Sequence, residues 1–248
     1  MVQSVLKKFD LRLVRHASLA QPSISSSACN LGLDCFLSAL KRVGFQPRHI
    51  IDVGANRGSW TRKAVHYFPD AQYTLVEPQD GLKVHIQDLL DGGSKITWIN
   101  TGLADKSGIL PFTVSYRDDS STFAPTQVDA SSPRLYLPVK TLNEIVSTLH
   151  APLPEVVKID AEGFDLKVLA GASDLLGKTD VFFVEVTICC EGYENTIARV
   201  VRTMDEAGYH VIDITDINRS PKYGVLWLCE LAFLRNASPI FESVTSYE

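Results

Sequence analysis

Residues 50–58 of this chain read IIDVGANRG, an apolar run that ends in a glycine-rich turn. The segment 59–67 that follows has the pattern of an amphipathic helix. Gly54 and Gly58 allow the backbone to turn tightly and to approach a ligand closely, and the first turn of the helix offers unpaired N–H donors. A buried strand, a glycine turn and a helix in this order indicate an open α/β sheet with a ligand at its edge.

The same alternation continues along the chain. Short apolar segments predict strands at 49–53, 73–76, 96–100, 156–159 and 181–186, and helical patterns fall at 31–43, 59–67, 81–90, 142–148, 166–176 and 195–207. This order predicts a mostly parallel sheet with helices on both faces. The segments 210–214 and 226–234 follow each other without a helix, so we expect an antiparallel pair at the sheet edge.

The domain organisation predicted from these patterns is simple. We expect an N-terminal extension at 1–29 and a single domain over 30–248, a length that suits one well-buried core. A polar stretch at 115–134, flanked by short strands at 110–114 and 137–139, predicts a loop on the substrate side. The N-terminal extension would pack on the domain, cover the acceptor cleft or form a contact in a homodimer.

Composition disfavours several classes of protein. The formal net charge of -5 argues against nucleic acid as a partner, and we find no apolar run long enough for a transmembrane segment. The N-terminus lacks the continuous apolar core of a signal peptide. The 5 cysteines have no C-x-x-C spacing, so they predict neither a zinc site nor a disulfide framework. We therefore expect a cytoplasmic protein.

An acidic residue after the second strand narrows the choice of cofactor. Glu77 ends that strand about twenty residues beyond Gly58, where a carboxylate can accept both hydroxyls of an adenosine ribose. Asn56 replaces the middle glycine of the NAD fingerprint, and Asp52 would place negative charge near a pyrophosphate. S-adenosylmethionine has no phosphate and carries a cationic sulfonium and amino group, so an acidic rim favours it over NAD.

Further motifs make the chain resemble the FkbM family of S-adenosylmethionine-dependent methyltransferases. The resemblance covers roughly 50–186 and depends on DVGANRG at 52–58, VEP at 76–78, VKIDAEGFD at 157–165, VLAGA at 168–172 and FVEV at 183–186. Members usually have Glu where this chain has Asp165.

The resemblance implies a class I methyltransferase fold, a Rossmann-like seven-stranded sheet with an antiparallel last strand. It also implies that Gly54, Asn56 and Gly58 line the methionine part of the cofactor and Glu77 its ribose. Asp105 lies in a stretch that resembles the family's adenine-binding segment, and we expect it either to accept from the adenine amino group or to be a turn residue.

Three carboxylates are predicted at the chemical end of the site. Asp160 and Glu162 follow one strand and Glu185 lies near the end of its neighbour, so they converge at one edge of the sheet. Such a cluster needs a cation, a proton or good hydrogen bonds. The sulfonium is one such cation, and a divalent metal is possible although no motif indicates one.

We predict that Asp160 or Glu162 takes the proton of an acceptor hydroxyl or holds that hydroxyl. The alternative for Glu162 is to cap the next helix and orient the turn at Gly163. Ser121 and Thr122 of the polar loop, with Glu185, are candidate substrate contacts, and Lys158 is expected to pair with a carboxylate.

The predicted function is an S-adenosylmethionine-dependent O-methyltransferase that acts on a hydroxyl of a small natural product or sugar. The resemblance supplies the preference for oxygen, since spacing alone permits N-methylation. An NAD-dependent oxidoreductase and a catalytically silent cofactor-binding module are the alternatives.

Overall fold

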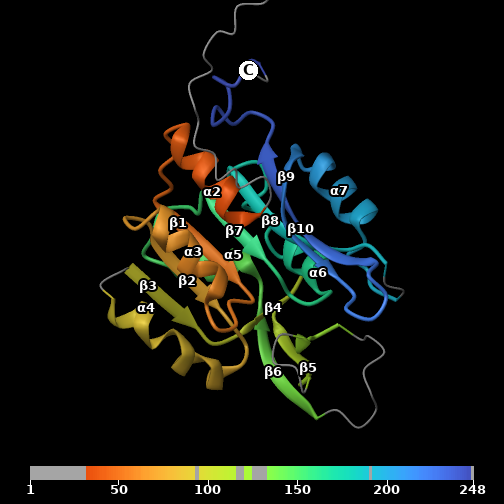
Figure 1. Ribbon diagram of the computed structural model, residues 1–248. Coiled ribbons are helices and arrows are strands. Elements are labelled where there is room, and N and C mark those ends of the chain that lie inside the picture. Colours follow the sequence, from red (N-terminus) through yellow and green to blue (C-terminus); the bar gives the residue numbers. More distant parts are fainter. Residues whose placement is uncertain (1–31, 93–94, 116–119, 125–132, 190–191, 247–248) are drawn as a thin grey trace, which may run out of the picture.

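A seven-stranded sheet forms the centre of the computed structural model, which describes residues 32–92, 95–115, 120–124, 133–189 and 192–246 (Figure 1). The order is β3-β2-β1-β7-β8-β10-β9. The strands are β1 (His49–Val53), β2 (Gln72–Val76), β3 (Lys95–Ile99), β7 (Val156–Ile159), β8 (Val181–Thr187), β9 (Tyr209–Arg219) and β10 (Leu226–Arg235). β10 is antiparallel to both β8 and β9, whereas the other neighbouring pairs are parallel. The predicted class I methyltransferase fold, with its antiparallel last strand, is confirmed. The N-terminal extension 1–29 lies outside the described residues.

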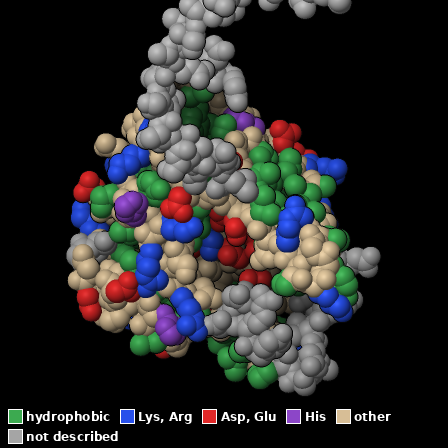
Figure 2. All heavy atoms as spheres, viewed as in Figure 1, with side chains coloured by type: hydrophobic (Ala, Val, Ile, Leu, Met, Phe, Trp, Pro, Cys, Tyr) green, Lys and Arg blue, Asp and Glu red, His purple; other side chains and the backbone are tan. Residues whose placement is uncertain are grey.

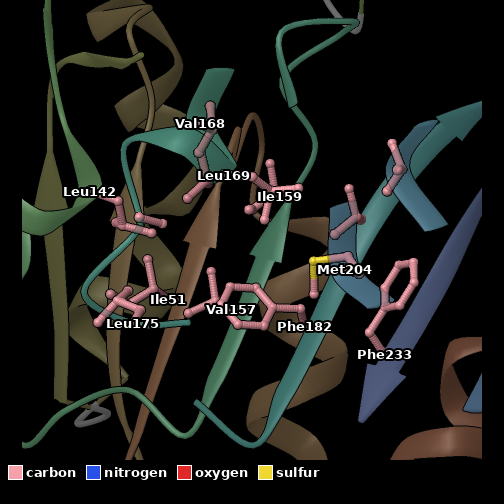
Figure 3. Packing of buried hydrophobic residues seen from close by; sticks show 14 of the residues in the cluster. Ile51, Leu142, Val157, Ile159, Val168, Leu169, Leu175, Phe182, Met204 and Phe233 are labelled. Atoms are coloured by element: carbon pink, nitrogen blue, oxygen red, sulfur yellow. The ribbon is translucent and has the colours of Figure 1, made fainter. Parts of the chain in front are cut away.

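Helices cover both faces of this sheet, as the alternating pattern predicts. One face packs against α2 (Leu33–Arg42), α3 (Ser59–Tyr67), the 3-10 helix η1 (Asp80–Ile86) and α4 (Gln87–Asp91), and the other against α5 (Leu142–Thr148), α6 (Asp165–Ala170) and α7 (Ile197–Glu206). On the face covered by α5, α6 and α7, Val157, Ile159 and Phe182 of the sheet pack against apolar side chains of these helices (Figure 3). The central strands are buried on both faces, which is why most of their residues are apolar.

A second, three-stranded sheet lies beside the main one (Figure 1). It consists of β4 (Gly102–Leu103), β6 (Arg134–Lys140) and β5 (Gly108–Thr113), in that order. β5 and β6 are the short strands predicted on either side of the polar loop. β4 is only two residues long, and it pairs with residues far along the chain, so no local pattern indicates it.

The helix expected at 166–176 ends earlier, at Ala170. Gly171 packs directly against the backbone of Ala104, and a Cβ at this position would lie 2.1 Å from the Ala104 carbonyl oxygen. This contact joins segments that are distant in the sequence, so periodicity alone extends the helix too far.

One cysteine departs from the expectation that the chain has no disulfide framework. Cys229 is a buried thiol and Cys189 an exposed one, but Cys35 is disulfide-bonded. In the part of the chain that the structure describes, no helix has the length and apolar character needed to cross a bilayer.

Candidate active site

A cleft of about 1330 Å³ opens at the carboxyl ends of the parallel strands. It lies where the strand order reverses, between β1 and β7, which is the usual ligand position in an open α/β sheet. The loop 120–124 and the β9–β10 hairpin complete its walls. Acidic side chains gather in a hollow near the middle of this face (Figure 2). Of the predicted site residues, the cleft brings together Gly54, Asn56, Glu77, Ser121, Thr122, Asp160, Glu162 and Glu185.

The glycine turn forms one wall of the cleft. Gly54 has a φ of 69°, and a Cβ there would lie 1.8 Å from the carbonyl oxygen of Asp160, so no larger residue fits. Asn56 also adopts a positive φ, 46°, and lines the cleft. Gly58 is the left-handed N-cap of α3 and does not line the cleft, because it faces the side chains of Ile86 and Leu89.

Glu77 lies just beyond β2, with only 3% of its surface exposed. Its Oε2 accepts from the backbone N–H of Asn56 at 3.0 Å, and its Oε1 accepts from the N–H of Gln79 at 3.0 Å. Burial raises the pKa of Glu77, although these two backbone donors oppose the shift. A carboxylate oxygen has room for more than one hydrogen bond, so Glu77 is positioned to accept from a diol as well.

Asp52 and Asp105 do not line the cleft. Asp52 is fully buried beneath it, where Oδ2 accepts from Thr61 Oγ1 and Oδ1 lies 3.3 Å from Lys158 Nζ. Asp105 is on the surface and pairs with Lys167 at 3.3 Å. Asp105 therefore lies in a surface ion pair, and Asp52 lies beneath the glycine turn.

Lys158 links the glycine turn at Gly54 to the carboxylate of Asp160. Its Nζ donates to the Gly54 carbonyl at 3.0 Å and lies 3.2 Å from Asp160 Oδ2. The predicted pairing of Lys158 with a carboxylate is confirmed. Burial lowers the pKa of Lys158, but the charges of Asp160, Asp52 and Glu230 outweigh it and raise the pKa overall.

The three predicted carboxylates meet at the floor of the cleft. One oxygen from each of Asp160, Glu162 and Glu185 lies within 4.8 Å of the other two. Burial first, and then the charges of Asp160 and Glu162, raise the pKa of Glu185 well above its ordinary value. Three carboxyl groups therefore share this floor, and Lys158 pairs with one of them, Asp160.

Asp165 holds the turn that carries Glu162. It is fully buried and accepts from the N–H of Ala161 at 2.9 Å, from the N–H of Gly163 at 3.1 Å and from Asn195 Nδ2 at 2.8 Å. These bonds hold the turn that precedes α6, whose N-cap residue, Phe164, makes no side-chain cap hydrogen bond. Asp165 therefore orients the turn at Gly163. Glu162 itself adopts a φ of 51°, which is unusual for a residue with a side chain, and lines the cleft.

The polar loop reaches this turn from the opposite side. Thr122 Oγ1 donates to the Glu162 carbonyl at 2.8 Å and accepts from the N–H of Ala124 at 2.8 Å. Ser121 Oγ accepts from the N–H of Ser115 at 3.1 Å. Both residues line the cleft, but the Thr122 hydroxyl already anchors the loop to the turn.

Other cleft residues were not singled out from the sequence. Thr187 follows Glu185 on the same face of β8, and its Oγ1 is buried with no hydrogen-bond partner in the described ranges. Asp216, Glu230 and the half-exposed Trp227 enter from the β9–β10 hairpin. Thr187 could have been predicted as a cleft residue, because it lies two residues beyond Glu185 and side chains two apart share one face of a strand. The hairpin residues could not, because their positions depend on how the last two strands return to the sheet.

A family model described as the Methyltransferase FkbM domain matches residues 52–211, a range that includes every carboxylate of the cleft floor. No curated protein sequence matches the chain. Solved structures with a similar chain path include precorrin-6y C5,15-methyltransferase from Geobacter metallireducens, with 14% identity, 85% of this chain and 93% of that chain covered, and a TM-score of 0.48. Magnesium protoporphyrin IX methyltransferase from Synechocystis, solved with bound S-adenosylhomocysteine, has 10% identity, coverages of 82% and 80%, and a TM-score of 0.49. A putative O-methyltransferase from Klebsiella pneumoniae has 14% identity, coverages of 87% and 84%, and a TM-score of 0.46.

Proposed function

The chain belongs to the FkbM family of S-adenosylmethionine-dependent methyltransferases, and from that premise we propose that it methylates a hydroxyl of a small natural product or sugar. The observation that carries this proposal is the position of two carboxylates, Asp160 and Glu162, on the cleft floor directly beside the Gly54 turn. A neutral alcohol must lose its proton to accept a methyl group, and carboxylates at that position are suited to take it.

The residues of the cleft fit the cofactor. Glu77, fixed by two backbone donors, would hold the ribose hydroxyls, and Gly54 and Asn56 would line the methionine part. Acidic side chains of the cleft, namely Glu77, Asp160, Glu162, Glu185, Asp216 and Glu230, outnumber the basic Arg57, Lys63 and Lys158. This excess suits a ligand with a cationic sulfonium and ammonium and opposes a pyrophosphate.

When bound, S-adenosylmethionine supplies an electrophilic methyl group on a cationic sulfur. Glu162 accepts the proton of the acceptor hydroxyl, because its carboxylate faces the cleft from a turn held by Asp165. Asp160 orients the same hydroxyl, since Lys158 fixes one of its oxygens. Alignment of the acceptor oxygen with the methyl group is the main source of rate in such a transfer.

The polar loop supports an acceptor rich in hydroxyl groups. Ser121 and Thr122 line the cleft opposite the carboxylates, and Trp227 offers an apolar surface on which a ring could stack. The cleft volume of about 1330 Å³ exceeds that of common ligand pockets, about 300–1,000 Å³, and so leaves space for an acceptor beside the cofactor.

Calorimetry tests the cofactor. We expect S-adenosylhomocysteine to bind with micromolar affinity, NADH to show no binding, and Glu77→Gln to weaken the first interaction at least 10-fold. Glu206→Gln is the matched control, because Glu206 is exposed at the end of α7 and lies outside the cleft. Binding of NADH alone would favour an oxidoreductase, and the absence of S-adenosylhomocysteine binding would end the proposal.

Methyl transfer from labelled cofactor tests the acceptor. Sugars and phenols should accept label, whereas analogues with an amine in place of the hydroxyl should not. Asp160→Asn and Glu162→Gln should each lower turnover by about 10²–10⁴-fold while cofactor affinity stays near that of the wild type. Faster transfer to the amines would replace O-methylation by N-methylation, and cofactor binding without turnover on the whole panel would favour a silent module.

A further inference from the structure

We propose that the cleft floor binds a divalent metal ion, with Asp160, Glu162 and Glu185 as ligands and the Thr187 hydroxyl as a further direct or water-mediated contact. The cation would be hard, such as Mg²⁺ or Mn²⁺, because every group offered is an oxygen.

The spacing of the carboxylates suits one shared ion. Two oxygens that each lie about 2.1–2.4 Å from the same ion are at most about 4.2–4.8 Å apart. One oxygen from each of the three residues lies within 4.8 Å of the others, so small side-chain movements suffice to coordinate a common ion.

The charge balance of the floor also favours a cation. Lys158 is the nearest base, but its Nζ already faces Asp52, Asp160 and the Gly54 carbonyl. Within the described ranges the Glu185 carboxylate has neither an ion pair nor a hydrogen bond. A single monovalent lysine therefore faces several acidic groups, and a divalent ion would neutralise the remainder.

Thr187 provides an independent indication of a ligand. It is 4% exposed, lines the same cleft, and has an Oγ1 that lacks a hydrogen-bond partner among the described residues. Because β8 alternates its side chains, Thr187 lies on the same face of the strand as Glu185. A buried hydroxyl left without a partner costs free energy, so this group is explained if a bound ion or its water completes its hydrogen bonding.

The role of the ion rests on the proposed methyl transfer to a hydroxyl. Three protein ligands leave coordination positions for water and for the acceptor oxygen. A bound ion would supply positive charge beside the acceptor oxygen and so favour the loss of its proton, which Glu162 would accept. The acceptor oxygen then forms its bond to the methyl carbon as the bond from that carbon to sulfur breaks, and the sulfur leaves as a neutral thioether.

The site is tested by titration of the full chain with Mn²⁺ alone. Binding is measured as the loss of the free-ion signal in electron paramagnetic resonance. We expect one ion per chain, an affinity at least 10-fold lower in Glu185→Gln, and a smaller loss in Thr187→Val that Thr187→Ser reverses. Glu206→Gln, on the exposed end of α7, is the matched control and should bind as the wild type does. Competition with excess Mg²⁺ should release the Mn²⁺.

Each outcome separates this site from the proposed function. If the wild type binds S-adenosylhomocysteine but no Mn²⁺, or if Glu185→Gln binds Mn²⁺ unchanged, the metal site is refuted and the methyltransferase proposal stands. If Mn²⁺ binds as expected but no acceptor is methylated, the site stands and its catalytic role is lost. Circular dichroism of each variant identifies any loss of binding that comes from unfolding.

Discussion

Replacement of Asp165 by Asn tests whether this buried carboxylate holds the turn that carries Glu162. In the wild type, Oδ1 accepts from Ala161 N–H, while Oδ2 accepts from both Gly163 N–H and Asn195 Nδ2. In the variant, the retained oxygen keeps the first bond, and an amide nitrogen replaces Oδ2. That nitrogen faces two donors and accepts from neither.

The structure sets the size of the effect. Asn195 can turn its amide, because its Oδ1 is buried with no partner in the described part of the chain, and then accept from the new amide. The Gly163 N–H is left without an acceptor, and a buried unsatisfied donor costs about 1–3 kcal/mol. For a chain of this size, about 1 kcal/mol lowers Tm by roughly 2–4 °C, so a loss of about 2 kcal/mol should lower Tm by about 4–8 °C.

Urea unfolding followed by far-ultraviolet circular dichroism measures this difference. We expect a lower midpoint with an unchanged slope, because the same surface is exposed on unfolding. Turnover should fall more than the affinity for S-adenosylhomocysteine, since Glu162 shifts while Glu77 keeps its own partners. Asp174→Asn, on the surface, is the control and should change stability by less than about 0.5 kcal/mol. An unchanged midpoint in Asp165→Asn would show that the carboxylate does not hold this turn.

Three further predictions concern the same fold. Glu77→Gln should weaken S-adenosylhomocysteine binding by about 10–100-fold in calorimetry, because hydrogen bonds to a charged group contribute about 1.5–3 kcal/mol; equal affinity would remove Glu77 from the site. Gly163→Ala should lower the free energy of unfolding by about 1–3 kcal/mol, since φ is 90° and the new Cβ would lie 2.6 Å from the Tyr193 ring. Adding Tyr193→Ala should recover only part of the lost stability, and full recovery would argue against backbone strain at Gly163. Burial lowers the pKa of His49 below 6.5, so the folded state binds a proton at this residue less readily than the unfolded state does. Its contribution to stability is therefore present above pH 6.5 and declines below it. The Tm of His49→Asn should depend less on pH between 6.5 and 5 than that of the wild type, and identical profiles would contradict this assignment.

Most of the main sheet could be predicted from the sequence because its strands are buried on both faces. The runs at β1, β7 and β8 are mostly apolar, and the carboxyl ends of such strands meet at one edge. The cleft positions of Gly54, Glu77 and Asp160 follow from that rule alone.

Other parts of the site depend on contacts that no local pattern contains. Asp52 lies inside β1, and strand alternation turns it toward Thr61 of α3 rather than toward a ligand. Asp165 meets Asn195 across 30 residues of chain, so its importance in the turn was visible only as a small departure from the family motif. The hairpin residues of the cleft required the register of β10 against β8 and β9.

The two sheets supply two separate parts of the cleft. The proposed cofactor residues Gly54, Asn56 and Glu77 lie just beyond strands of the seven-stranded sheet, whereas the loop with Ser121 and Thr122 is attached to the three-stranded sheet. A change in the segment attached to the smaller sheet should therefore alter the acceptor contacts and leave the proposed cofactor residues in place. A replaced segment must reproduce the hydrogen bond from Thr122 to the Glu162 carbonyl. We expect chimaeras between relatives to stay active where this bond is kept.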